Sequence, residues 1–225
     1  MSNEGYGLSA VAKAMADRSA EAFLLKNISD SCITDLFVGD NQKGKLVIIS
    51  GPSGVGKTTI CAEIVKKTDA FLSISTTTRE KGEGEIEGET YRFISKEDFE
   101  QKIKEEYFLE YANVFENYYG TAWQPVEDAI ESGQTVILEI DVQGALTVKK
   151  VFDDAEMIFV LPPHKTDLEK RMGSRARGES PQSAQIRLDS ASQETAKAWQ
   201  YYDHMVINDD LEQAINEIMK IINSN

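Results

Sequence analysis

A glycine-rich segment near residue 50 separates an apolar run from a stretch with helical periodicity. The apolar run covers residues 45–50, and the stretch that begins at Lys57 repeats apolar side chains at Ile60, Ile64 and Val65. A short continuous apolar run is typical of a buried strand, and apolar residues three or four positions apart are typical of a helix. The sequence therefore predicts a strand, a tight turn and a helix, the first unit of an α/β fold.

The turn carries the spacing Gly-x-x-x-x-Gly-Lys-Thr, the P-loop pattern that binds the phosphates of a nucleoside triphosphate. Glycines let backbone N–H groups approach the phosphates, and the helix N-terminus adds a favourable dipole. Lys57 is expected to reach the β- and γ-phosphates, which makes it a catalytic candidate, and the Thr58 hydroxyl is expected to coordinate Mg²⁺. The predicted ATP-binding segment comprises Gly51, Pro52, Ser53, Gly54, Val55, Gly56, Lys57, Thr58 and Thr59.

Three further apolar runs and one amphipathic stretch continue the alternation of strand and helix. The runs cover residues 135–141, 157–161 and 204–207, and the apolar residues of 211–222 share one helical face. The uninterrupted runs 135–141 and 157–161 indicate central parallel strands that are covered on both faces. The predicted fold class is therefore α/β, a three-layer P-loop NTPase fold with a parallel central sheet.

A block of different texture, about residues 73–123, interrupts this rhythm. It is rich in Thr, Tyr, Phe, Gly and Glu and contains short β-prone pieces such as residues 90–93. We expect a small mixed sheet inserted over the C-terminal edge of the core sheet, where open α/β folds bind ligands and a second substrate could bind. The predicted domain is then 43–225, with its core in 43–72 and 124–225.

Residues 1–42 differ from the domain that follows. Apolar residues recur with helical spacing between Leu8 and Phe23, and a less regular stretch continues through residues 39–41. We predict an N-terminal extension formed by a short amphipathic helix and a linker. Two roles stay open for it: a partly ordered extension without a catalytic role, or a segment that docks on a partner or sister subunit.

The charge balance limits the partners of the chain. Its 225 residues include 24 Lys and Arg against 38 Asp and Glu, which gives a net charge of −14. This is the wrong sign for a protein whose general surface wraps a polyanion, so nucleic acid is not an expected partner. Two cysteines, Cys32 and Cys61, are too few for a disulfide framework, and no apolar run reaches the roughly 18 residues of a membrane span. We expect a cytoplasmic protein with no membrane partner.

The P-loop pattern is shared by several classes of nucleotide-dependent protein. A GTPase would carry a guanine-reading Asn-Lys-x-Asp segment, and the chain has none. An energy-transducing ATPase is disfavoured, because the chain is small and its insertion has the character of a substrate-covering piece. A small-molecule kinase is the class that remains.

Several short motifs follow the P-loop. They are residues 75–79 (STTTR) with Gly84-Glu85, Gly88, Tyr91 and Phe93, then 108–112 (FLEYA), 117–121 (NYYGT), 138–144 (LEIDVQG) and 206–210 (VINDD). In type and order they resemble the guanylate kinase family, the nucleoside monophosphate kinases that make GDP from GMP. The resemblance covers roughly Gly44 to the C-terminus, and together these motifs are far more specific than the P-loop alone.

The resemblance implies a guanine-binding site. Guanine presents two adjacent donors, N1–H and the exocyclic amine, and a carboxylate in its plane accepts both, a task that Glu110 fits. The family adds hydroxyls at Ser75 and Thr121, with Asp141 also facing the base. An unpaired polar group in such a site costs about 1–3 kcal/mol, so AMP should be strongly rejected.

The resemblance also implies a site for the acceptor phosphate, formed by Arg79, Tyr91 and Tyr119. The chain departs from the family pattern here, because Gly82 occupies the position of a usual second arginine. Lys81 or Arg92 could substitute for it. We expect weaker GMP binding with the reaction class unchanged.

An arginine cluster follows the run 157–161 and resembles the mobile lid of the family, which we assign to about residues 164–190. Arginines are suited to stabilise the charge that spreads over a migrating phosphoryl group. The resemblance implies catalytic roles for Arg171, Arg175 and Arg187, whereas Arg177 has no clear counterpart and the lid is one residue longer than usual.

Two acids, Glu139 and Asp141, end the run 135–141 at the edge where nucleotide and Mg²⁺ are expected. Both are assigned to the GMP site, and either one could contact Mg²⁺ through water. The resemblance further places Asn208 near the adenine of ATP. The lone His164 and His204 are expected to be structural.

The predicted reaction is in-line phosphoryl transfer from ATP with Mg²⁺ to GMP or dGMP, without a phosphoenzyme, as the lid and GMP-binding region close to exclude water. Two alternatives stay open: a non-catalytic guanylate-kinase-like module that binds a phosphorylated peptide, and a related P-loop kinase for a sugar phosphate. An intact P-loop and arginine lid oppose the first, because a binding module has no use for them. The sequence leaves open whether the chain is a monomer or a homo-oligomer.

Overall fold

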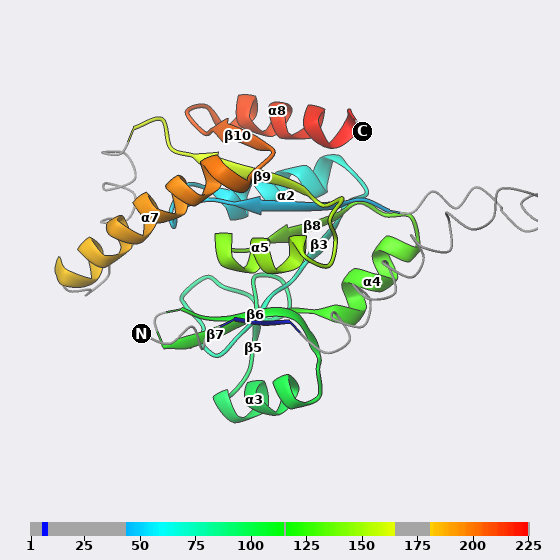
Figure 1. The fold of residues 1–225 in the computed structure, drawn as a ribbon, viewed down its shortest axis with the longest axis vertical. Helices are drawn as coiled ribbons and strands as arrows, with labels where there is room; N and C mark the ends of the chain where they lie inside the picture. Colours follow the sequence, from blue (N-terminus) through cyan, green and yellow to red (C-terminus); the bar gives the residue numbers. More distant parts are fainter. Residues whose placement is uncertain (1–5, 9–43, 115, 165–180, 225) are drawn as a thin grey trace, which may run out of the picture. The chain divides into compact units, whose positions relative to one another are not determined.

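The computed structural model describes residues 6–8, 44–114, 116–164 and 181–224, which fall into two compact units (Figure 1). Each unit has its own sheet and its own apolar packing. The core unit comprises Leu46–Leu72, Ile137–Leu146 and Ala155–Asn225, and the mixed-sheet unit comprises Met1–Lys45, Ser73–Val136 and Thr147–Asp154.

The core unit is built on a five-stranded sheet with the order β10-β9-β2-β8-β3. β9 runs parallel to both neighbours, with Ile158 opposite His204 on one side and opposite Ile49 on the other. The central strands are buried along most of their length, which explains their continuous apolar sequences. The strands are β2 (Leu46–Ser50), β3 (Phe71–Ser73), β8 (Val136–Glu139), β9 (Glu156–Leu161) and β10 (His204–Ile207).

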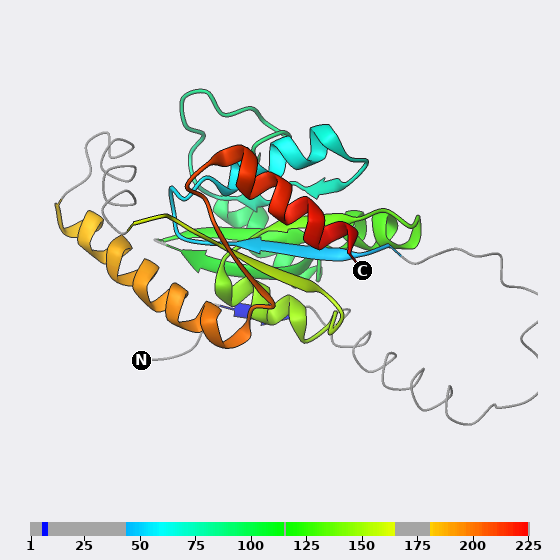
Figure 2. The same cartoon turned by 90° about the horizontal axis from the view of Figure 1, so that it is seen from above.

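Helices cover both faces of this sheet, with α2 and α8 on one face and α5 and α7 on the other (Figure 1). Figure 2 shows α8 lying over the sheet. This is the predicted three-layer α/β architecture. None of the helices in the described ranges is long and apolar enough to cross a membrane. Their bounds are α2 (Lys57–Lys67), α5 (Val142–Lys149), α7 (Pro181–Tyr201) and α8 (Leu211–Asn223).

Separate apolar clusters fill the two faces of the core sheet. On one face, Ile158 packs in a cluster with Ile60 of α2 and Ile218 of α8. On the other, Phe159 packs with Val142 of α5. Successive side chains of a strand point to opposite faces, so Ile158 and Phe159 pack against the helices on opposite faces of the sheet. Burial of each large apolar side chain contributes about 1.5–3 kcal/mol, which fixes α2 and therefore its N-terminus against the sheet.

The mixed-sheet unit holds the second sheet, with the order β1-β6-β7-β4-β5. β4 and β5 run parallel, and the other three pairs run antiparallel. The pairing of β6 with β7 shifts register between Phe108 and Glu110. The strands are β1 (Tyr6–Leu8), β4 (Thr76–Thr77), β5 (Arg92–Phe93), β6 (Phe108–Val114) and β7 (Asn117–Ala122).

Stacked aromatic rings pack against this second sheet. The ring of Phe99 lies 4.3 Å from that of Phe108 and 5.1 Å from that of Tyr118, measured between centroids. A Cβ atom at Gly120 of β7 would lie only 2.8 Å from the Phe108 ring, so glycine is what lets the strand and the ring approach this closely. Two helices of the unit are α3 (Lys96–Lys104), which carries Phe99, and α4 (Trp123–Glu131).

The structure confirms the predicted core strands to within about two residues, as well as the last helix and the mixed sheet. β1, β3, α3 and α4 go beyond the sequence prediction. Within the extension 1–42, the structure describes Tyr6–Leu8, and Leu8 of the expected helical pattern lies in strand β1. The rest of the expected helix and linker lies outside the described residues.

Candidate active site

The loop of residues 51–56 connects β2 to α2 through three glycines with positive φ. Gly51, Gly54 and Gly56 have φ angles of 152°, 84° and 105°, values that residues with a Cβ atom rarely adopt. A Cβ at Gly51 would lie 2.4 Å from the Val160 carbonyl oxygen, so the loop passes directly against β9. The glycines thus allow a backbone path that other residues would block.

Asn208 holds this loop from the end of β10. Its side-chain Nδ2 donates to the Val55 carbonyl at 2.8 Å, and its backbone N–H donates to the Leu161 carbonyl at 2.8 Å. Asn208 is 5% exposed, so losing the side-chain bond would leave buried polar groups unsatisfied. The structure therefore gives Asn208 a role in positioning the loop, and its contact with adenine stays a prediction.

Lys57 begins α2 and turns its ammonium group towards the loop. The Nζ atom donates to the carbonyl of Gly51 at 2.5 Å and to that of Pro52 at 3.3 Å. The ammonium group and the helix N-terminus are both favourable partners for negative charge. This arrangement suits a phosphate chain, as the sequence predicts.

Thr58 and Glu139 meet beside the start of α2. The Thr58 hydroxyl donates to Glu139 Oε1 at 2.8 Å and so joins the helix to the end of β8. Asp141 is used differently, because its Oδ1 accepts the backbone N–H groups of Gln143 and Gly144, each at 2.8 Å, in the first turn of α5. Of the two predicted acids, Glu139 is the one that contacts Thr58.

Two partly buried titratable groups, Glu194 and Tyr202, belong to this region without having been singled out in the sequence. Burial raises the pKa of Glu194 to about 7, while the nearby Lys57 opposes this shift and Asp141 adds to it. Burial also raises the pKa of the Tyr202 hydroxyl well above its usual range. Both groups sense the charge of Asp141, so they surround the same part of the core unit.

In the mixed-sheet unit, Glu110 and Thr121 lie opposite each other on β6 and β7. The Thr121 hydroxyl donates to Glu110 Oε1 at 2.6 Å, and the two residues are 4% and 1% exposed. A buried carboxylate is costly unless it is hydrogen-bonded, and such groups are concentrated at functional sites. Ser75 is partly buried before β4, and its backbone carbonyl accepts the Arg92 N–H at 2.9 Å.

The three residues predicted to bind the acceptor phosphate lie together in this unit. The Arg79 guanidinium lies over the ring of Tyr91 at 5.5 Å and over that of Phe93 at 5.8 Å. The rings of Tyr91 and Tyr119 meet edge to face, with centroids 6.0 Å apart. A guanidinium beside two phenol groups offers donors of the kind that bind a phosphate.

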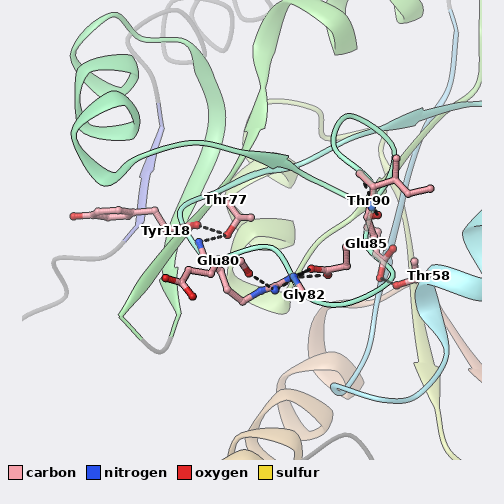
Figure 3. A network of polar contacts seen from close by, with 10 residues as sticks. Thr58, Thr77, Glu80, Gly82, Glu85, Thr90 and Tyr118 are labelled. Carbon is pink, nitrogen blue, oxygen red and sulfur yellow. Dashed lines mark hydrogen bonds and ion pairs between the residues drawn. The ribbon is translucent and has the colours of Figure 1, made fainter. Parts of the chain in front are cut away.

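Arg79 is hydrogen-bonded to Glu85, a partner that the sequence analysis did not assign; Figure 3 labels Glu85 and the neighbouring Gly82. Arg79 Nη1 and Nη2 donate to Glu85 Oε2 and Oε1 at 3.0 and 2.7 Å, and the Gly82 N–H donates to Oε2 at 2.6 Å. The hydrogen bonds from Arg79 lower the pKa of Glu85, and Glu85 raises the pKa of Arg79. The guanidinium is thus oriented before any ligand arrives.

Gly82 leaves room for this ion pair. A Cβ atom at Gly82 would lie 2.9 Å from Glu85 Oε2 and 3.7 Å from Arg79 Nη1. Any side chain at this position, including the arginine of the family pattern, therefore requires the Glu85 carboxylate to move. Lys81 and Arg92, the two cations expected to substitute, are both exposed.

The predicted lid arginines cannot be placed in the same way. Arg171, Arg175 and Arg177 lie outside the described residues, and so does the side chain of Arg187 in α7. Their catalytic roles stay predictions.

The histidines and the described cysteine take part in none of the hydrogen bonds described above. His204 contacts Glu156, its neighbour on β9, and His164 is exposed. Cys61 is buried in α2, and burial raises the pKa of its thiol. Cys32 lies outside the described residues.

A glycine loop that enters a helix with a lysine and a threonine, on a three-layer parallel sheet, defines a P-loop NTPase fold of the phosphotransferase class. Within this class, the chain belongs to the guanylate kinase family, because the family model described as Guanylate kinase matches residues 43–225.

Individual relatives agree with this assignment. The chain is 46% identical over 183 residues to a guanylate kinase of Carboxydothermus hydrogenoformans, which covers 80% of this chain and 88% of the relative. It is 45% identical over 183 residues to a guanylate kinase of Clostridium tetani, covering 81% and 87%. A crystal structure of guanylate kinase from Anaplasma phagocytophilum matches 81% of this chain and 86% of its own, with a TM-score of 0.69 and 28% identity.

Replacement of Asn208 by Asp tests the anchoring of the loop. The variant keeps the size of the side chain but removes the Nδ2 donor to Val55, so the loop should loosen and the Kd for ATP should rise about tenfold. Titration calorimetry measures this Kd. Asp209→Asn changes an exposed neighbour and should leave it within about twofold. Equal ATP affinity in Asn208→Asp and the unaltered chain would contradict the anchoring role.

Glu194→Gln tests the raised pKa in the core unit. Between its ordinary value of 4.5 and about 7, Glu194 keeps a proton in the folded state that the unfolded state has lost. The free energy of unfolding should therefore fall as pH rises through this window, by about 1–2 kcal/mol after allowance for solvent screening. Urea unfolding at pH 5 and pH 8 should show this loss reduced in Glu194→Gln but retained in the exposed control Glu212→Gln. The same loss in both variants would refute the assignment.

Proposed function

We propose that the chain transfers the γ-phosphoryl group of ATP to GMP, and also to dGMP, and releases ADP and the nucleoside diphosphate. The reaction is that of a guanylate kinase, the family to which the chain belongs. Identity of about 45% with curated guanylate kinases over most of the chain supports it. ATP and GMP are then the small-molecule substrates, and purine nucleotide metabolism is the setting.

The main observation in favour of GMP as the phosphoryl acceptor is the burial of the Glu110 carboxylate. It is fixed by Thr121 at 2.6 Å and lies at the position that the family resemblance gives to the guanine-reading acid. A carboxylate accepts the two adjacent N–H donors of guanine, whereas adenine presents an acceptor at N1. A mismatched base leaves buried polar groups unpaired, which is how such a site rejects it strongly.

On the donor side, the loop 51–56, Lys57 and Thr59 bind the triphosphate of ATP in this proposal. Backbone N–H groups and the N-terminus of α2 offer hydrogen bonds and a favourable dipole to the phosphates. The Lys57 ammonium exchanges its loop carbonyl partners for phosphate oxygens and stabilises the charge of the transferred group. Asn208 holds Val55 and so keeps the loop in its binding conformation.

Mg²⁺ accompanies ATP, and Thr58 and Glu139 are the residues that would hold it. Their hydroxyl and carboxylate oxygens already meet at 2.8 Å, and Mg²⁺ takes oxygen ligands together with water and substrate phosphates. The described residues include no group of three or more His, Cys, Asp and Glu that could hold a metal without such help. When bound, the ion neutralises charge on the β- and γ-phosphates.

On the acceptor side, Arg79, Tyr91 and Tyr119 bind the phosphate of GMP, and Ser75, Glu139 and Asp141 complete the site around the nucleoside. Arg171, Arg175 and Arg187 stabilise the charge of the phosphoryl group in flight. The attacking oxygen belongs to the GMP phosphate, so no side chain acts as a nucleophile. Catalysis depends on orientation and electrostatic stabilisation.

The two alternatives are not favoured. A phosphopeptide-binding module would not need Lys57 and Thr58 at the start of α2. A sugar-phosphate kinase would leave the buried pair of Glu110 and Thr121 without a task. The chain is similar over most of its length to curated guanylate kinases.

The test is ADP production by the purified protein with GMP, dGMP, AMP, UMP and CMP offered separately. We expect turnover with GMP and dGMP. Glu110→Gln, which replaces an acceptor by a donor, should lower kcat/KM for GMP at least about a hundredfold. Glu100→Gln, an exposed control in the same unit, should leave it unchanged. Turnover of AMP or UMP with none of GMP would reject the proposal.

A further prediction concerns the missing arginine at Gly82. Gly82→Arg adds a second guanidinium near the acceptor phosphate and should lower the KM for GMP about three- to tenfold. Gly82→Ala introduces the same contact with Glu85 without the charge, and its KM should be unchanged or higher. Equal KM values in the two variants would mean that the second arginine adds no phosphate contact in this chain.

A further inference from the structure

Strand β1 comes from outside the part of the chain that the family shares. Tyr6–Leu8 lies ahead of residues 43–225, which the family model matches, yet it forms the outer strand of the mixed sheet. It pairs antiparallel with β6, with Tyr6 opposite Ala112, Gly7 opposite Tyr111 and Leu8 opposite Glu110. The N-terminal extension therefore touches the strand that carries the proposed guanine-reading residue.

Two structural features of β6 indicate that a partner strand on the β1 side stabilises it. Without β1 it would be an edge strand, with a row of backbone groups open to solvent or to another chain. On its other side, the pairing with β7 shifts register between Phe108 and Glu110. Irregularities of this kind bend a strand and interrupt its ladder. Leu8 pairs with Glu110, the first residue after the irregularity, so from this residue onward β6 is held by β1 on one side and by β7 on the other.

We propose that strand β1 is a working part of the acceptor site, because it holds β6, and with it the Glu110 carboxylate, in the conformation that binds GMP. Residues 6–8 are then positioning residues: they act through β6 without touching the substrate. The inference rests on the proposed function of Glu110 in reading guanine. It assigns the N-terminal extension a role in substrate affinity.

A three-residue ladder is short, so docking of β1 competes with release of the strand. When only a fraction of the molecules holds a competent site, the apparent affinity falls by that fraction. Loss of β1 should therefore raise the KM for GMP and spare the steps that depend on the core unit. The kcat and the KM for ATP should change little.

The experiment compares the full chain with a variant that lacks residues 2–8 and with a double variant, Tyr6→Pro together with Gly7→Pro. Along an edge strand such as β1, every second backbone N–H points towards the neighbouring strand, here β6. Two consecutive prolines therefore remove one N–H donor to β6, whichever of the two residues supplies it. The matched control, Tyr6→Ala with Gly7→Ala, keeps both N–H groups. Steady-state kinetics and hydrogen exchange of the β6 amides, residues 108–114, are measured for all four proteins.

We expect a KM for GMP about tenfold higher in the truncated and proline variants, with kcat and the KM for ATP within about twofold. The β6 amides should exchange faster in those two proteins and as in the full chain in the alanine control. An unchanged or lower KM for GMP in an active truncated protein, with unchanged exchange, would overturn the inference. Failure of the proposed function is a different result, the absence of GMP turnover by the full chain.

Discussion

The packing of the glycine loop against the ends of β9 and β10 is the constraint on which the proposed ATP-binding site depends. Gly51 approaches the Val160 carbonyl so closely that a Cβ would lie 2.4 Å from it, and Asn208 ties Val55 to the end of β10. Both strands run parallel to their neighbours in the buried core sheet. The close-packed apolar contacts of the core sheet therefore set the position of Lys57 at the start of α2. Such packing is rigid enough to hold a phosphate-binding group in place.

The mixed-sheet unit positions its polar groups by a different kind of force. Its predicted ligand-binding residues are held by charged or short hydrogen bonds inside the unit, such as Thr121 to Glu110 and Arg79 to Glu85. Such networks are stable only when each buried member is satisfied. These hydrogen bonds also fix the orientation of the side chains, because a bidentate contact with a carboxylate holds the guanidinium group in a single plane. The mixed sheet can in this way present directed donors and acceptors.

The sequence predicts those parts of the structure that are determined by residues close together in the chain. The buried strands β2 and β9 show as continuous apolar runs, and the phosphate-binding loop shows as a fixed spacing of Gly, Lys and Thr. The start of α3 also had a local signal, since Ser95 accepts the Asp98 N–H as an N-cap. By contrast, the link from Asn208 to Val55 joins residues 153 positions apart. Glu85 lies in a loop with no periodicity, and β1 is too short to show a strand pattern, so only the folded chain reveals either.

The net charge of −14 shapes how this protein can bind anionic nucleotides. Long-range attraction is small or repulsive for such a chain, so affinity has to come from local geometry. The proposed acceptor site illustrates this, because Arg79 is paired with Glu85 and Gly82 occupies the sequence position of a second arginine. An incoming phosphate therefore meets an oriented ion pair with phenol groups beside it, instead of an uncompensated positive cluster. In the proposed function, hydrogen-bond direction and the fit of the base at Glu110 supply most of the discrimination, and the proposed support of β6 by β1 then contributes to affinity.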